Sequence, residues 1–359
     1  MKDPNFVLEI ITGKRKGLVA ALIRFGLVCL EPAYRIAIKF RNRKYDIAIS
    51  AYDESVVHFA EVPVVSVGNL TTGGTGKTPF VIWLARILRE RNLRVALISR
   101  GYGAVEAGRN DEAREIEHRL TDVPHLQDPD RSRMAAIAVE ELESQILVLD
   151  DGFQHRQLAR DIDIVLIDAT CPFGHEHLLP RGLLREPLES LKRADLVVIN
   201  RINLVPIETV EKIRERIAEF TEFRRIGTSE IIPQNWLQFS GRRFELDHLT
   251  GKRILMVCGI GNPDNFRQTL IQIGLDVIQQ KIFPDHHAFS RDDMNDLGKL
   301  AKSSTVDAIV CTHKDLVKIG VDIVAELPVY AVLITVELNE GKELLDQLID
   351  EACEKISSQ

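Results

Sequence analysis

A glycine-rich run followed by lysine and threonine is the part of the sequence best suited to phosphate chemistry. Residues 68–78 have the sequence GNLTTGGTGKT. Backbone N–H groups of such a loop cradle phosphates, the lysine reaches the β and γ oxygens, and the next hydroxyl binds Mg²⁺. A merely structural glycine turn would need neither the lysine nor the final threonine. We therefore predict a nucleotide site, with Thr78 also as a metal ligand, made of Thr71, Thr72, Gly73, Gly74, Thr75, Gly76, Lys77 and Thr78.

Two adjacent carboxylates, Asp150 and Asp151, follow an apolar run at 145–149. Side by side after a buried strand, they are costly unless a cation compensates their charge. In P-loop enzymes an acidic residue in this place holds the Mg²⁺ shell. We predict both as Mg²⁺ ligands, and a solvated turn is the alternative.

A third run with chemical potential is FPDHHAFS at 283–290. It is open to three interpretations: a metal cluster, a helix cap, or a general base with its orienting carboxylate. No second histidine cluster stands at ligand spacing, so metal is the weaker choice. A base that deprotonates an acceptor hydroxyl suits a kinase better. His175 and His177 have the His-x-His spacing of a metal site, but a surface loop is the favoured interpretation. The run THKD at 312–315 has its lysine misplaced for reading guanine, which favours ATP over GTP.

The elements that position these residues follow a βαβ pattern from residue 62 onwards. Short apolar runs end in a polar or glycine residue each time, as expected of strands buried on both faces of a parallel sheet. They lie at 62–67, 94–99, 145–149, 162–167 and 195–199, and the last two precede Asp168 and Asn200. A helical pattern covers 80–90. The fold class is therefore α/β, a P-loop parallel sheet with helices on both faces and its site along the carboxyl edge.

The domain boundaries follow from changes in the pattern. We predict a P-loop kinase domain at 46–228, linker strands at 229–248 and a smaller α/β domain at 249–335. The last segment, 336–359, is predicted as a helix, with the first domain as a candidate packing partner.

The first 45 residues carry ten basic and three acidic side chains, a net charge of +7, whereas the whole chain has −7. The apolar runs within them, 17–23 and 25–30, are too short to cross a bilayer, which needs about 20 apolar residues. We predict an amphipathic segment, 1–45, lying in the headgroup layer of an anionic membrane, where each basic side chain contributes about 1 kcal/mol. A core helix packed on the next domain is the alternative. Nucleic acid is not expected as a partner, because aromatic interleaving is absent.

The cysteines and the composition limit the class of protein further. Five scattered cysteines form no Cys-x-x-Cys pair, which argues against a disulfide framework and a structural zinc site and fits a reducing cytosol. An apolar fraction of 45% and a charged fraction of 28% are those of an ordinary globular protein. We predict no secretory signal and infer no obligate protein partner.

Seven runs stand in one order along the chain: SVGNLT at 66–71, GGTGKTP at 73–79, SRGYG at 99–103, DDGFQH at 150–155, LLPRGLLREP at 178–187, GIGNP at 259–263 and FPDHH at 283–287. Together they resemble the tetraacyldisaccharide 4′-kinase family, the lipid A 4′-kinases of Gram-negative bacteria. Thr71, where the general P-loop pattern has glycine, is usual in this family. The resemblance covers residues from about 64 to 315 and is far more specific than the P-loop alone.

The resemblance implies a reaction and a location. ATP, with Mg²⁺, would phosphorylate the 4′-hydroxyl of an acylated glucosamine disaccharide 1-phosphate at the cytoplasmic face of the bacterial inner membrane, where the protein is peripheral. It also implies that two domains, joined by a two-stranded linker, close over the substrates. The competing hypothesis is a nucleotide-switch ATPase of the partitioning or metallochaperone type, without a lipid acceptor.

The resemblance further implies individual site residues. Gln154 and Arg185 would bind nucleotide, and Glu186 would bind Mg²⁺. His286 corresponds to the family's histidine that pairs with an aspartate to activate the hydroxyl.

Asp111 is the matching aspartate, in the run NDEA at 110–113, where the family has Gly-Asp-Glu. The segment before it is also shorter than is usual. A charged residue on an exposed helix is the alternative for Asp111. His313 stands where the family generally has glutamate.

Overall fold

The structure is a computed structural model, and it describes residues 5–12, 15–101, 111–285 and 287–357. It divides into two compact units. The first comprises Met1–Arg100, Asp122–Glu230 and Leu338–Gln359, and the second comprises Gly101–Thr121 and Ile231–Glu337. The segment 101–121 thus groups with the second unit, although the sequence-based boundaries put it inside the P-loop domain.

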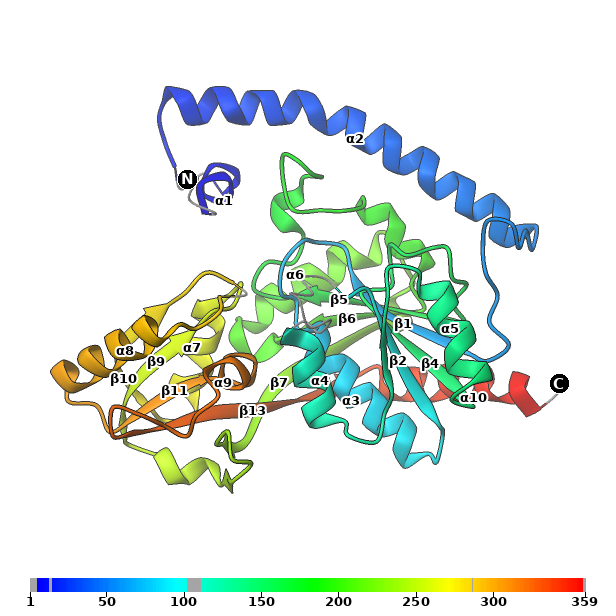
Figure 1. Cartoon of the computed structure of the whole chain (residues 1–359). Helices are drawn as coiled ribbons and strands as arrows, with labels where there is room; N and C mark the ends of the chain where they lie inside the picture. Colours follow the sequence, from blue (N-terminus) through cyan, green and yellow to red (C-terminus); the bar gives the residue numbers. More distant parts are fainter. Residues whose placement is uncertain (1–4, 13–14, 102–110, 286, 358–359) are drawn as a thin grey trace. The chain divides into compact units, whose positions relative to one another are not determined.

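The first unit is built on a parallel sheet with the strand order β3-β2-β4-β1-β5-β6-β7 (Figure 1). Five of these strands are buried along their whole length, so both faces of the sheet are covered. The predicted parallel sheet is confirmed. The strands are β1 (Val64–Asn69), β2 (Val95–Ser99), β3 (His125–Gln127), β4 (Ile146–Asp150), β5 (Ile162–Asp168), β6 (Leu196–Asn200) and β7 (Ile226–Leu237).

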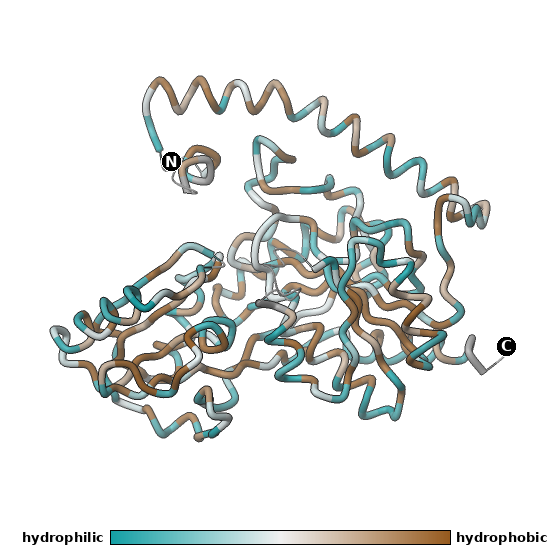
Figure 2. The backbone as a smooth tube through the Cα atoms, viewed as in Figure 1, coloured by the Kyte–Doolittle hydropathy of each residue, from teal (hydrophilic) through white to brown (hydrophobic). Residues whose placement is uncertain are grey.

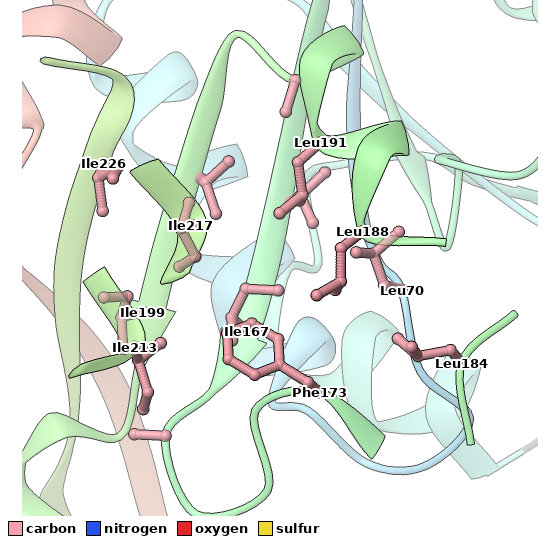
Figure 3. Close-up of a cluster of buried hydrophobic side chains, with 14 of the residues drawn as sticks. Leu70, Ile167, Phe173, Leu184, Leu188, Leu191, Ile199, Ile213, Ile217 and Ile226 are labelled. Carbon is pink, nitrogen blue, oxygen red and sulfur yellow. The ribbon is translucent and has the colours of Figure 1, made fainter. Parts of the chain in front are cut away.

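Helices cover this sheet on both faces. Helix α3 (Lys77–Glu90) contacts β1, β2 and β4, and α10 (Lys342–Ser357) contacts β5. Alternate side chains of the strands form cores with α5 (Arg131–Glu140) and α6 (Ile207–Ala218). Figure 3 shows the core under α6, which also holds Leu70 and Leu184. These two leucines adjoin site residues, so the core fixes the loops that carry the site.

The N-terminal part of the first unit consists of α1 (Asn5–Ile11) and the long helix α2 (Leu18–Ser50). The second half of α2 is anchored by hydrogen bonds: the Tyr34 hydroxyl donates to the carbonyl of Arg185 at 3.0 Å, and Asn42 Nδ2 donates to Glu186 at 2.7 Å. The first half is largely exposed, and apolar positions recur along it (Figure 2). Among the described residues, no helix combines the length and apolarity that crossing a membrane requires.

The second unit has a four-stranded parallel core in the order β10-β9-β11-β13. Strands β7 and β13 each contribute residues to both units. The strands are β8 (Arg243–Phe244), β9 (Arg253–Cys258), β10 (Asp276–Ile282), β11 (Ala308–Thr312), β12 (Ile323–Val324) and β13 (Leu327–Glu340), with helices α4 (Asp111–Arg119), α7 (Pro263–Gln272), α8 (Arg291–Ser304) and α9 (His313–Ile319).

Candidate active site

The glycine-rich loop joins the carboxyl end of β1 to the first turn of α3. Gly76 takes a left-handed conformation (φ 84°) directly before Lys77, where α3 begins. A Cβ added to Gly73 or Gly74 would meet no atom within 4 Å, so the backbone there faces open space. Gly68 is different, since its Cβ would lie 2.7 Å from the backbone nitrogen of Phe153. That close approach brings the loop against the turn that follows β4.

Lys77 lies between the loop and the acidic turn. Its Nζ donates to Asn69 Oδ1 at 3.1 Å and lies 3.4 Å from Asp151 Oδ1. The Arg185 guanidinium donates to both carboxylate oxygens of Asp151, at 2.8 Å each, and to the Asn69 carbonyl at 3.0 Å. Two cations, Lys77 and Arg185, therefore hold the Asp151 carboxylate beside the glycine-rich loop.

The positive charges of Lys77 and Arg185 determine the protonation state of Asp151. Burial by itself would raise the pKa of this carboxyl, but the charge of Lys77 and the hydrogen bond and charge of Arg185 outweigh it and hold the pKa well below its usual range. Asp151 is therefore ionised at neutral pH. Asp150, at the end of β4, is also buried. Two carboxylates and a lysine at one strand edge are suited to a divalent cation and a polyphosphate.

Buried polar atoms at the loop test whether a nucleotide with Mg²⁺ fits these residues. Gln154 Nε2 donates to the Asn69 carbonyl at 3.0 Å, while Gln154 Oε1 is buried and has no hydrogen-bond partner within the part of the chain that the structure describes. The same holds for Thr75 Oγ1. The Thr75 hydroxyl can donate to a phosphate oxygen beside the open space at Gly73 and Gly74, whereas Gln154 Oε1 can only accept, which suits Mg²⁺ or a water bound to it. The residues present therefore fit the cofactor.

Glu186 is fully buried and bound on one oxygen by three donors. Its Oε2 accepts from Asn42 Nδ2 at 2.7 Å, from Ser190 Oγ at 3.0 Å and from Arg193 at 3.0 Å. Through these contacts Glu186 ties α2 to the 3₁₀ turn Leu188–Arg193. They give the residue an anchoring role, and its assignment as a Mg²⁺ ligand stays a prediction.

The structure brings most of the predicted nucleotide residues together in the first unit: Thr71 to Thr78 in the loop, Asp150, Asp151 and Gln154 on the next turn, and Arg185. Thr71 itself forms a bridge with Leu184, so its segment pairs with the one carrying Arg185. Sequence reasoning missed Asn69, which accepts from Lys77 and also from Arg185 through its side-chain oxygen. Its position at the end of β1 was the available signal.

The predicted catalytic pair belongs to the second unit. Asp111 is the first residue of α4, and its side chain is not described. His286 lies outside the described residues. Their pairing stays a prediction.

Three other histidines singled out in the sequence have defined surroundings. His177 Nδ1 lies 3.0 Å from Glu31, and His175 belongs to the 3₁₀ turn Gly174–Glu176. His313 is buried, with Nε2 3.2 Å from His118 Nδ1. Over the residues that the structure describes, no group of three or more His, Cys, Asp or Glu side chains is placed to hold a metal ion.

We expect His155 to make stability depend on pH. Burial, followed by repulsion from Arg131, Arg160 and Arg41, lowers the pKa of His155 to about 4. In the unfolded chain histidine titrates at about 6.5. Between these values only the unfolded state binds the proton, so stability falls as the pH falls from about 6.5 to about 4.

Urea unfolding of the wild type and of His155→Gln, at a series of pH values, measures this effect. The wild type should lose stability relative to the variant between pH 7 and pH 4.5. Parallel curves for the two proteins would contradict it.

Known proteins resemble this chain over most of its length. The model of the family described as tetraacyldisaccharide-1-P 4′-kinase matches residues 23–354. A tetraacyldisaccharide 4′-kinase from Halothermothrix orenii is 35% identical, over 89% of this chain and 89% of its own length. One from Anaeromyxobacter sp. (strain Fw109-5) is 35% identical over 97% and 96%. The solved structure of LpxK from Aquifex aeolicus in complex with ATP is 28% identical, covers 92% of this chain and 99% of its own, and has a TM-score of 0.68.

The matched range includes the glycine-rich loop, the acidic turn, Arg185 and the two segments that contain Asp111 and His286. Sequence, fold and site therefore agree over almost the whole length. The chain belongs to the tetraacyldisaccharide-1-P 4′-kinase family.

Proposed function

We propose that this chain transfers the γ-phosphate of ATP to the 4′-hydroxyl of an acylated glucosamine disaccharide 1-phosphate, in lipid A biosynthesis. The observation that carries the proposal is the arrangement of Lys77, Asp151 and Arg185 around an open glycine-rich loop, in a chain that matches the kinase family from residue 23 to 354. Family membership favours this kinase over a nucleotide-switch ATPase, which would act without a lipid acceptor.

The residues of the first unit would bind and orient the nucleotide. The loop N–H groups and Lys77 would hold the phosphates, and Gln154 and Arg185 would support them. Thr78, Asp150 and Asp151, with Glu186 as a further candidate, would hold Mg²⁺, which neutralises charge on the β and γ oxygens. Lys77 and Arg185 already surround Asp151. Mg²⁺ bound to this carboxylate would replace part of these contacts and free Lys77 and Arg185 for the phosphates.

The acceptor would be activated from the second unit. His286, oriented by Asp111, takes the proton of the 4′-hydroxyl as its oxygen bonds to the γ-phosphorus and the bond to the ADP oxygen breaks. Most of the rate enhancement in phosphoryl transfer comes from positioning and charge neutralisation. The base therefore matters through the alignment of the hydroxyl as well as through its basicity.

The reaction is tested with ATP labelled in its γ-phosphate, Mg²⁺ and tetraacyldisaccharide 1-phosphate in detergent. We expect label in the lipid, and consumption of ATP that depends on the acceptor. A folded protein that binds ATP but labels no lipid would overturn the proposal.

We further propose that the protein works at the cytoplasmic face of the inner membrane as a peripheral protein, held by α2. Large apolar side chains on the first half of this helix are exposed, namely Leu18, Val19, Leu22, Phe25, Val28 and Leu30. Basic side chains accompany them, including Lys16 and Arg24. Lys14 lies outside the described residues, and Arg15 pairs with Glu9 at 3.1 Å. An apolar face with flanking cations suits the headgroup layer of an anionic membrane.

Replacing Phe25 by glutamate is expected to weaken binding to anionic vesicles. The change removes a large apolar side chain and adds a charge that the leaflet repels, which should lower affinity about 10- to 100-fold. Phe223→Glu is the matched control, because Phe223 is 63% exposed and Phe25 is 69% exposed in the same unit. Sedimentation with vesicles at physiological salt measures both. Equal binding of the two variants would refute the role of α2.

A further inference from the structure

The proposed mechanism leaves unused two polar residues that end strands next to the glycine-rich loop. Asp168 is the last residue of β5 and Asn200 is the last residue of β6. Both are buried. A buried carboxylate and a buried amide are retained in a core only where hydrogen bonds compensate their burial. Their partners therefore indicate what they do.

Asn200 binds the loop directly, and Asp168 is linked to it through Arg201; together they reach two successive carbonyl groups of the loop. Asn200 Nδ2 donates to the carbonyl of Thr75 at 2.9 Å. The neighbouring Arg201 donates through its guanidinium to the carbonyl of Gly74, also at 2.9 Å, and forms an ion pair with Asp168. Gly74 lies three residues before Lys77, and Thr75 lies two residues before it.

Each donor is itself held in place. Asn200 Oδ1 accepts from Ser229 Oγ at 3.0 Å and from the Arg201 N–H at 2.9 Å, so its amide is fixed in one orientation. Asp168 accepts from the backbone N–H and the hydroxyl of Thr170, at 3.0 and 2.7 Å. Arg201 has a left-handed backbone (φ 64°), a conformation that is unfavourable for a non-glycine residue and persists where its surroundings determine it.

We propose that Asp168, Asn200 and Arg201 form a loop clamp that positions the glycine-rich loop for the nucleotide. A peptide plane turns as a unit, so tying the Thr75 carbonyl away from the site turns the Gly76 N–H toward it. Tying the Gly74 carbonyl fixes the preceding peptide plane, whose Thr75 N–H donates to the Gly73 carbonyl at 3.2 Å. Gly73 and Gly74 have no side chains that could fix these peptide planes, and the Thr75 hydroxyl has no hydrogen-bond partner among the described residues. The clamp supplies the missing constraint from outside the loop.

The strand order shows which part of the nucleotide the clamp supports. In the order β4-β1-β5-β6, the strand bearing Asp150 lies on one side of β1, and the clamp lies on the other. Mg²⁺ bridges the β- and γ-phosphates in P-loop enzymes, which puts the γ end on the β4 side. The clamp therefore lies on the side left for the α-phosphate and nucleoside. Its residues act through the loop and are positioning residues.

The inference rests on one part of the proposed function, the binding of nucleotide at the glycine-rich loop. It is therefore tested by binding measurements without the lipid acceptor. We compare Arg201→Ala and Arg201→Lys with Arg224→Ala, a control at an arginine with 75% of its side chain exposed in the same unit. Calorimetry measures the affinity for ATP with Mg²⁺, for ADP and for inorganic tripolyphosphate. Circular dichroism and thermal unfolding confirm that each variant is folded.

Arg201→Ala is expected to weaken all three ligands by a similar factor, about 10- to 100-fold. Arg201→Lys should show a smaller loss, about threefold or more, because an ammonium cannot hold Asp168 and Gly74 in one fork. In kinetics the KM for ATP should rise while the KM for the acceptor stays unchanged. Arg224→Ala should match the wild type.

Two results would overturn the clamp. One is unchanged affinity for tripolyphosphate in Arg201→Ala or, if that variant does not fold, in Arg201→Lys. The other is a loss confined to ATP and ADP, which would make Arg201 a direct contact of the nucleoside. The clamp and the acceptor proposal can fail separately. If Arg201→Ala loses tripolyphosphate binding while the wild type labels no lipid, the clamp is supported and only the proposed lipid acceptor is refuted.

Discussion

Replacing Lys77 by alanine is expected to lower kcat/KM for ATP by about 10²–10³-fold, the usual effect of removing one preorganised donor to developing charge. Lys77 reaches both Asn69 and Asp151 and so stands where the loop and the acidic turn meet. Without it, the β and γ oxygens lose a cation that is fixed before the nucleotide binds. Arg185 stays beside Asp151, but its guanidinium replaces only part of the lost charge, because it also holds that carboxylate and Asn69.

Steady-state kinetics with ATP and the lipid disaccharide measure the loss. Lys212→Ala is the matched control, since Lys212 is an exposed lysine on α6 in the same unit. The control should keep full activity. If kcat/KM for ATP stayed within threefold of the wild type in both Lys77→Ala and Lys212→Ala, the loop would not bind the triphosphate as proposed.

The sheet and its carboxyl edge could be predicted from sequence because strands buried on both faces give continuous apolar runs. The runs at 62–67, 94–99 and 145–149 correspond to β1, β2 and β4 to within two residues at each end. The residues following them fall at one edge, because all these strands are parallel. Local pattern thus determined both the elements and where the chemistry lies.

Contacts between distant segments could not be predicted in this way. Asn69 accepts from Arg185, 116 residues away, and Arg201 donates to the carbonyl of Gly74, 127 residues away. Strand ends commonly carry such residue types. The segment 101–121 follows β2 directly, yet it groups with the second unit, because its helix α4 packs against α9. Glu186 illustrates the converse. The resemblance implies that it binds Mg²⁺, which stays a prediction, and its Oε1 is buried without a hydrogen-bond partner among the described residues. The three donors on Oε2 add an anchoring role that only the folded chain shows.

The second large effect concerns the proposed pair Asp111 and His286, whose elements are anchored at the same turn of the second unit. His313 lies 3.7 Å from Glu115 on α4, the helix that begins at Asp111. The next residue, Lys314, donates to Asp285 at 3.0 Å, directly before His286 in the chain. The first turn of α9 thus contacts both segments, which favours the proposed pairing.

Asp111→Asn and His286→Ala are each expected to lower kcat for lipid phosphorylation by about 10²–10⁴-fold, with the KM for ATP little changed, because general-base catalysis contributes on that order. If the two act as one unit, the double variant loses no more than the worse single variant. His287→Ala is the neighbouring control. His287 lies 3.1 Å from Asp293 and stacks on Phe283, so its loss should affect stability and spare kcat. Additive losses in the double variant would show that Asp111 and His286 act separately, and an equal loss of kcat in His287→Ala would assign the base to the wrong histidine.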